Sequence, residues 1–142
     1  MTSETHSSER SFSIGEVEIT DSSVPYVVAE IGNNHQGDLD TAKQMIRAAA
    51  AAGASAVKFQ KRDNKALFTE EAFNAPYESE NAFGRTYGEH REALEFEHDD
   101  YVTLMKEADS EGIEFFATPW DFPSVDFLEA LDVPAFKVAS CD

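Results

Sequence analysis

The sequence is poor in cysteine, in basic residues and in long apolar runs. Cys141 is the only cysteine among 142 residues, so no internal disulfide can form and a reducing cytosol is expected. Only 11 side chains are basic against 28 acidic ones, which gives a formal net charge of −17. This deficit argues against binding to nucleic acid or to an anionic membrane. No apolar run approaches the roughly 18 residues of a membrane span, and no secretory apolar core stands at the start. We expect a soluble, cytoplasmic protein.

The chain has the size of one domain or of part of a larger one. Its hydrophobic content of 42% is enough for a sizeable core. The acidic residues are spread along the chain, as in proteins adapted to high salt. Adaptation of this protein to a high-salt environment is a hypothesis. Residues 1–10 are polar and serine-rich and are expected to be disordered. Residues 11–25 predict a small β-hairpin and a linker, and residues 26–142 the main fold.

Strand and helix patterns alternate after residue 26. The spacing predicts strands over 27–31, 56–60, 113–117 and 135–139, and helices over 39–52, 99–111 and 124–131. Asp38 is placed to cap the first helix and Gly53 to end it. This order indicates an α/β fold with a parallel sheet, either a (β/α)₈ barrel or a doubly wound sheet.

The segment 61–97 is long for a connection in an α/β domain, and such segments are usually functional or disordered. A short helix is expected near residues 64–68. The aromatic residues Phe73, Tyr77, Phe83 and Tyr87 favour order. We therefore expect a folded loop over the site.

Polar residues gather where the predicted strands end. They are Glu30, Lys58, Gln60, Thr118, Lys137 and Ser140. The carboxyl ends of parallel strands form the ligand-binding edge of such sheets. Two lysines in otherwise apolar strands, with hydroxyl groups beside them, suit a phosphate or a carboxylate. For one lysine alone, a side chain that merely reaches solvent is the simpler interpretation.

Several motifs resemble those of the sialic acid (N-acetylneuraminate) synthases. They read AEIGNNHQGDL, VKFQK, YGEHREALEF, ATPWD and VPAFKVAS, in the family's order and spacing. Members of that family condense phosphoenolpyruvate with N-acetylmannosamine or a related sugar. The resemblance implies a (β/α)₈ barrel followed by an antifreeze-like domain, and a homodimer. The chain would supply the first half of the barrel, about four strands; the other half and the antifreeze-like domain would be absent.

The resemblance also implies residue roles. Phosphoenolpyruvate would be bound by Lys58, Thr118, Lys137 and Ser140; Glu30 would act beside the reacting carbonyl oxygen of the sugar; Gln60 and Asn81 would contact the sugar. A divalent metal, Mn²⁺ or Mg²⁺, would be held by later strands, so none of its ligands is expected here. His35 and His90 either form structural hydrogen bonds or contact substrate. Cys141 stands where the family more often has glycine, and its simplest interpretation is a tolerated small residue.

Other functions stay open at this point. The chain as given could be a non-catalytic fragment that binds an anion, with activity confined to its parent. The parent could instead make a related nonulosonic acid, legionaminate or pseudaminate, and the phosphorylation of its acceptor is undetermined. An aldolase on the same barrel would use Lys58 or Lys137 as a Schiff base, so borohydride would trap pyruvate on that lysine.

Overall fold

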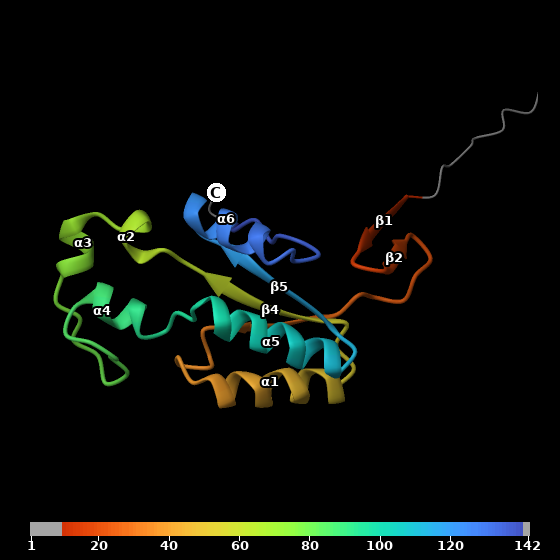
Figure 1. The fold of residues 1–142 in the computed structure, drawn as a ribbon, viewed down its shortest axis with the longest axis horizontal. Coiled ribbons are helices and arrows are strands. Elements are labelled where there is room, and N and C mark those ends of the chain that lie inside the picture. The colour runs from red at the N-terminus through yellow and green to blue at the C-terminus, as the bar shows by residue number, and fades with distance from the viewer. Residues whose placement is uncertain (1–9, 141–142) are drawn as a thin grey trace, which may run out of the picture.

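The computed structural model describes residues 10–140, so the predicted disorder of residues 1–9 and the role of Cys141 lie outside it. The first element of the described residues is the predicted hairpin, in which β1 (Ser11–Ile14) pairs antiparallel with β2 (Val17–Thr20). Figure 1 shows this hairpin beside the main body, at the end away from α3 and α4. None of the described helices is both long and apolar enough to cross a membrane.

The main body is built on a parallel sheet of three strands in the order β3-β4-β5. The strands are β3 (Val28–Gly32), β4 (Ala56–Lys61) and β5 (Glu114–Pro119). The helices α1 (Leu39–Ala51) and α5 (His98–Ser110) run side by side along the sheet, and α6 (Phe122–Ala130) follows β5 (Figure 1). The predicted α/β alternation is confirmed, with element ends that differ by a few residues.

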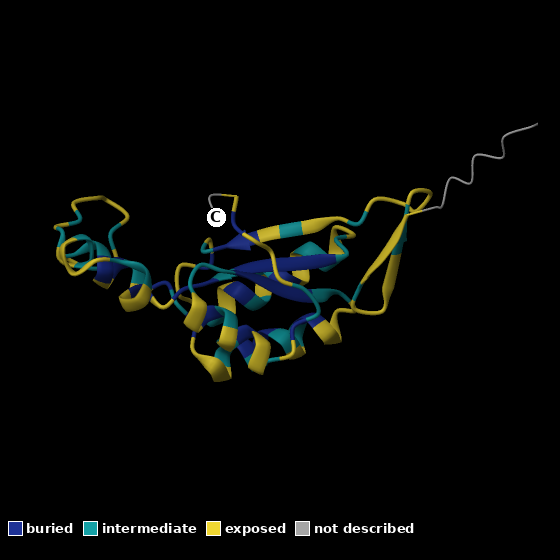
Figure 2. Cartoon of the chain, turned by 90° about the horizontal axis from the view of Figure 1, so that it is seen from above, coloured by how far each residue is buried: buried dark blue, intermediate teal, exposed yellow. Residues whose placement is uncertain are grey.

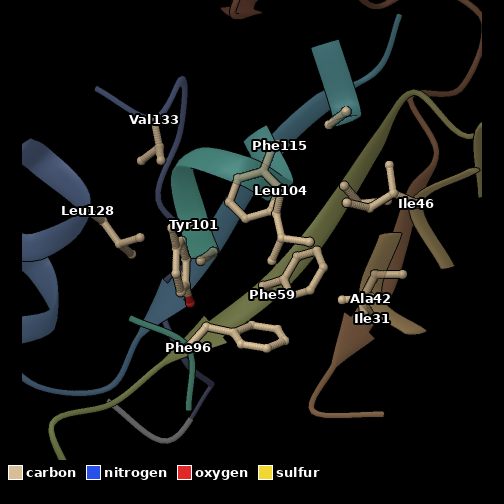
Figure 3. Close-up of a cluster of buried hydrophobic side chains, with 13 residues drawn as sticks. Ile31, Ala42, Ile46, Phe59, Phe96, Tyr101, Leu104, Phe115, Leu128 and Val133 are labelled. Carbon is tan, nitrogen blue, oxygen red and sulfur yellow. The ribbon is translucent and has the colours of Figure 1, made fainter. Parts of the chain in front are cut away.

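The core lies between the sheet and its helices. Its side chains come from alternate strand positions and from one stripe of each helix; the labelled members include Ile31, Ala42, Ile46, Phe59, Leu104 and Phe115 (Figure 3). The Phe59 and Phe115 rings stack with centroids 5.0 Å apart. Burying one such side chain is worth about 1.5–3 kcal/mol, so the core fixes which face of each strand points away from the helices.

The segment 61–97 is ordered, as expected, although not irregular throughout. It forms three short helices, α2 (Asn64–Leu67), α3 (Glu70–Asn74) and α4 (Tyr87–Glu92). The rings of Tyr77, Phe83 and Tyr87 pack around His90. Figures 1 and 2 both show this segment as a lobe that extends beyond the carboxyl end of β4. It lies beside the sheet edge and does not fold back over it.

The predicted fourth strand over 135–139 is wrong. Phe136 forms an isolated parallel bridge with Ala117, and the Lys137 N–H donates to the Ala117 carbonyl at 3.2 Å. Pro134 has no N–H to extend this ladder toward its start. Phe136 and Val138 are exposed, so little apolar burial holds the segment extended.

Candidate functional site

Lys58 is the centre of the candidate site. Its Nζ lies 2.6 Å from Glu30 Oε2 and donates to Thr118 Oγ1 at 3.0 Å. The strand register explains this meeting, because Glu30 stands opposite Lys58 on β3, and Thr118 lies on β5 two residues beyond Phe116, the residue opposite Lys58. All three side chains point to the sheet face opposite the core. The structure therefore brings together three of the residues predicted from strand ends.

The surroundings of Lys58 suit an anionic ligand. Lys58 is 8% exposed, whereas the side chain of Glu30 is 52% exposed. An ammonium group this deeply buried requires an anionic partner, and Glu30 supplies one from the solvent side. An incoming phosphate or carboxylate can share or replace that partner because the Glu30 carboxylate is free to hydrate.

Gln60 borders the same site, next to Gly32. Gly32 has a φ of +56°, and a Cβ built on it would lie 3.1 Å from Glu30 Oε1 and 3.4 Å from Gln60 Nε2. Glycine therefore lets both side chains approach the end of β3. The backbone carbonyl of Gln60 accepts a hydrogen bond from the Tyr101 hydroxyl at 2.9 Å.

Three predicted site residues are not brought into this cluster. Lys137 is exposed and its Nζ donates to the carbonyl of its neighbour Val138. Ser140 is also exposed. Asn81 is exposed in the loop between α3 and α4, where its backbone N–H donates to Ser79 Oγ at 3.2 Å. The Phe136–Ala117 bridge sets a register in which a continued ladder would place Lys137 opposite Thr118.

The two histidines of the motifs have structural contacts. His35 is 2% exposed, stacks on Phe96 with ring centroids 4.2 Å apart, and its Nδ1 accepts from the Gly37 N–H at 3.0 Å. Burial lowers the pKa of His35 to about 4, against a smaller opposing effect of its hydrogen bond with the Gly32 backbone. His90 Nδ1 accepts from the Phe83 N–H at 3.2 Å, and burial together with the positive charge of Arg91 lowers its pKa.

Sequence reasoning missed a buried charged cluster formed by Lys61, Arg62 and Glu95. Lys61 Nζ donates to the Phe96 carbonyl at 2.9 Å, and Glu95 Oε2 accepts from the Arg62 backbone N–H at 3.1 Å. Burial raises the pKa of Glu95, and its hydrogen bond with the Arg62 backbone and the two cations oppose this rise. The cluster borders a cavity of about 500 Å³ beside α6. The available signal was the pair of cations that directly follows Gln60.

No group of three or more His, Cys, Asp or Glu side chains within residues 10–140 is arranged to hold a metal ion. The described residues thus do not form a complete site for the divalent metal that the resemblance implies.

The profile of the NeuB family matches residues 45–142, which is more than half of the chain. The chain belongs to the NeuB family. This NeuB-family chain is 50% identical over 117 residues to N-acetylneuraminate-9-phosphate synthase of Homo sapiens, covering 82% of the chain and 33% of that relative. It is 40% identical over 116 residues to N,N'-diacetyllegionaminic acid synthase of Legionella pneumophila, covering 81% of the chain and 33% of that relative. It thus spans about a third of the length of these curated relatives.

Solved structures show the same fold. The crystal structure of N-acetylneuraminic acid synthetase from Leptospira borgpetersenii, in complex with citrate, matches with a TM-score of 0.74 and 32% identity. The match covers 94% of this NeuB-family chain and 42% of that one. The predicted first part of a (β/α)₈ barrel after a small hairpin is confirmed, with three strands formed in place of about four.

Proposed function

We propose that the full-length protein containing this chain condenses phosphoenolpyruvate with an N-acetylmannosamine-type sugar to give a sialic acid and inorganic phosphate. The observation that carries this proposal is the Glu30–Lys58–Thr118 cluster at the carboxyl edge of the sheet. It occurs in a chain that is 50% identical to an N-acetylneuraminate-9-phosphate synthase. The cluster supplies a fixed cation beside a carboxylate and a hydroxyl, and an anionic enol substrate needs such groups.

The likeness to 9-phosphate synthases favours a phosphorylated acceptor. The reaction adds the three carbons of phosphoenolpyruvate to carbon 1 of a six-carbon sugar, so carbon 6 of the acceptor becomes carbon 9 of the product. A product phosphorylated on carbon 9 therefore requires a 6-phosphate on the acceptor. N-Acetylmannosamine 6-phosphate is the acceptor that we propose, ahead of the unphosphorylated sugar and of the precursors of legionaminate or pseudaminate.

The chemistry assigns a part to each residue of the cluster. Carbon 3 of phosphoenolpyruvate attacks the sugar aldehyde, whose oxygen takes up a proton. Water then adds at carbon 2, and the bond from carbon 2 to the phosphate oxygen breaks and releases phosphate. Lys58 and Thr118 hold the phosphate or carboxylate of phosphoenolpyruvate, and Glu30 orients the aldehyde oxygen or protonates it. A divalent metal bound elsewhere in the full-length protein would polarise that aldehyde.

The remaining site roles are also proposals. Lys137 and Ser140 complete the phosphoenolpyruvate site once their segment pairs with β5 beyond the Ala117–Phe136 bridge. Gln60 and Asn81 contact the sugar, with Asn81 carried on the lobe of helices α2 to α4. Assembly as a homodimer and a cytoplasmic location stay predictions of the same family resemblance and composition.

The test is phosphate release by the full-length gene product with Mn²⁺, phosphoenolpyruvate and one of three acceptors. We expect release with N-acetylmannosamine 6-phosphate to exceed that with the unphosphorylated sugar or with a 2,4-diacetamido sugar, and the product mass to retain one phosphate. Release with none of them would overturn the proposal. Borohydride trapping of pyruvate on Lys58 or Lys137 would replace it by a Schiff-base aldolase.

A further inference from the structure

Gln60 is held from two sides by residues outside the predicted substrate contacts. Tyr101 donates to its backbone carbonyl, and Arg62 Nη2 donates to its side-chain Oε1 at 2.5 Å. A guanidinium group has donors only, so Oε1 and not Nε2 must face Arg62. The amide nitrogen therefore points the other way, toward the end of β3 where Gly32 and Glu30 lie.

Arg62 is itself fixed in place. It is 6% exposed, and its guanidinium carbon lies 4.4 Å from the centre of the Trp120 ring. Glu95 accepts from the Arg62 backbone N–H, and Glu95 Oε1 lies 3.8 Å from Arg62 Nη1. That separation is longer than a hydrogen bond. The guanidinium therefore makes its short polar contact with Gln60. The Trp120 ring and the Glu95 carboxylate restrict the movement of the Arg62 side chain.

We propose that Arg62 is a positioning residue of the sugar site, which sets the orientation of the Gln60 amide so that its two N–H donors face the acceptor beside Glu30. The inference rests on the proposed function, because it assigns Gln60 to the sugar. It specifies the chemistry that Gln60 can recognise: a carbonyl or hydroxyl oxygen with a free lone pair, such as the oxygen of an acetamido group. A rotated amide would place an NH₂ group against the guanidinium, donor against donor.

The central test compares Arg62→Lys with the wild type in the full-length gene product. Lysine keeps a positive charge near Glu95 but lacks the planar fork of donors that stacks on Trp120, so it holds the Gln60 amide less firmly. We expect the KM for the sugar to rise about tenfold, the magnitude of one charge-assisted hydrogen bond, while the KM for phosphoenolpyruvate stays unchanged. In a Gln60→Ala background the same substitution should cause no further rise, since Arg62 acts through Gln60.

Arg91→Lys is the matched control. Arg91 also donates from its guanidinium to a partly buried partner, the Tyr87 hydroxyl, at 2.9 Å, but it does not contact Gln60. Its substitution should leave the KM for the sugar unchanged. Trp120→Phe, which reduces the aromatic surface under Arg62 and keeps the guanidinium, should raise the KM for the sugar less than Arg62→Lys does. If Arg62→Lys shows no cooperative thermal transition and is therefore unfolded, the KM of Trp120→Phe for the sugar tests the positioning role instead.

The outcomes separate the two proposals. A wild-type protein that releases no phosphate with any acceptor contradicts the proposed function. An active wild type whose Arg62→Lys and Gln60→Ala effects are additive contradicts the positioning role alone. An unchanged KM for the sugar in both Arg62→Lys and Trp120→Phe does the same.

Discussion

At the scale of residues, the two strand lysines have different surroundings. Lys58 is nearly buried between β3 and β5, and its ammonium group contacts Glu30 and Thr118. Lys137 is exposed on a segment that touches β5 through one bridge. In the anion site that we propose, Lys58 is therefore the central cation, and Lys137 can only add to it.

Lys58→Met tests this assignment. Methionine has a similar length but removes the charge, so one charge-assisted hydrogen bond of about 1.5–3 kcal/mol is lost. We expect the Kd for phosphoenolpyruvate to rise at least about tenfold in calorimetry on the full-length protein. Lys65→Met, at an exposed position in α2, is the control and should bind normally. Normal phosphoenolpyruvate binding by Lys58→Met would remove Lys58 from the site.

Glu30→Gln separates catalysis from binding. Glutamine preserves the shape of the side chain and removes the carboxylate that we expect to act on the aldehyde oxygen. The kcat should fall by about 10²-fold or more, typical of a lost acid or base, with a much smaller change in phosphoenolpyruvate affinity. Steady-state kinetics with a calorimetric Kd measures both. Turnover at the wild-type rate would confine Glu30 to the ion pair with Lys58.

His35 makes stability depend on pH. Its pKa is about 4 in the folded protein and near 6.5 in the unfolded chain, because burial disfavours the imidazolium. Between these values the unfolded state binds more protons, so the contribution of His35 is intact above pH 6.5 and is lost as the pH falls toward 4, by about 3 kcal/mol at most. Urea unfolding should show the advantage of wild type over His35→Gln shrinking across this range. Glu95 has a raised pKa, so its contribution to stability has the opposite pH dependence. Because that contribution is the same in both proteins, it cancels when the unfolding free energy of His35→Gln is subtracted from that of the wild type. A constant difference between pH 7 and pH 4 would contradict the prediction.

At the scale of elements, local patterns predicted what depends on neighbours in the sequence. The hairpin, the βαβ order and the Asp38 cap, which accepts from the Thr41 N–H at 2.6 Å, all follow from spacing and turn chemistry. The prediction of a fourth strand was wrong because a strand also requires a hydrogen-bonded partner strand, and the local sequence pattern contains no information about such partners. The contact of Glu95 with Arg62 was not predicted, for a similar reason. The two residues are 33 positions apart, and no local pattern indicates that they meet.

The turn between β3 and α1 depends on Gly37. Its φ is +77°, and a Cβ there would lie 2.1 Å from the Ala93 carbonyl oxygen after α4. Gly53, at the end of α1, has a similar φ of +85° with nothing within 4 Å of a Cβ. Gly53→Ala should therefore cost only the backbone strain, about 1–2 kcal/mol, whereas Gly37→Ala adds a steric clash and should cost more. Urea unfolding of both variants measures this difference, and equal losses would show that the contact with Ala93 carries no stability.

At the scale of the whole molecule, charge and apolar surface act in opposite directions. The net charge of −17 repels other copies of the chain. Several apolar side chains on or beside the sheet are nevertheless exposed, including Val27, Val28, Phe136 and Val138. Figure 2 shows exposed residues along much of the outer surface around the buried strands. We therefore expect the solubility of the 142-residue chain to depend on ionic strength.

Salt should thus drive the isolated chain to self-associate. Electrostatic repulsion reaches about 30 Å at 0.01 M salt and about 3 Å at 1 M, so high salt leaves the apolar attraction unopposed. We expect light scattering to show a monomer at low NaCl concentration and larger species at high concentration. The double variant Val28→Ser, Val138→Ser keeps the charge and should stay monomeric throughout. An unchanged mass at all salt concentrations, or association of the double variant to the same extent, would mean that these side chains do not attract a second copy. The result bears on the high-salt hypothesis as well, because a chain adapted to that environment must cover this surface when its charges are screened.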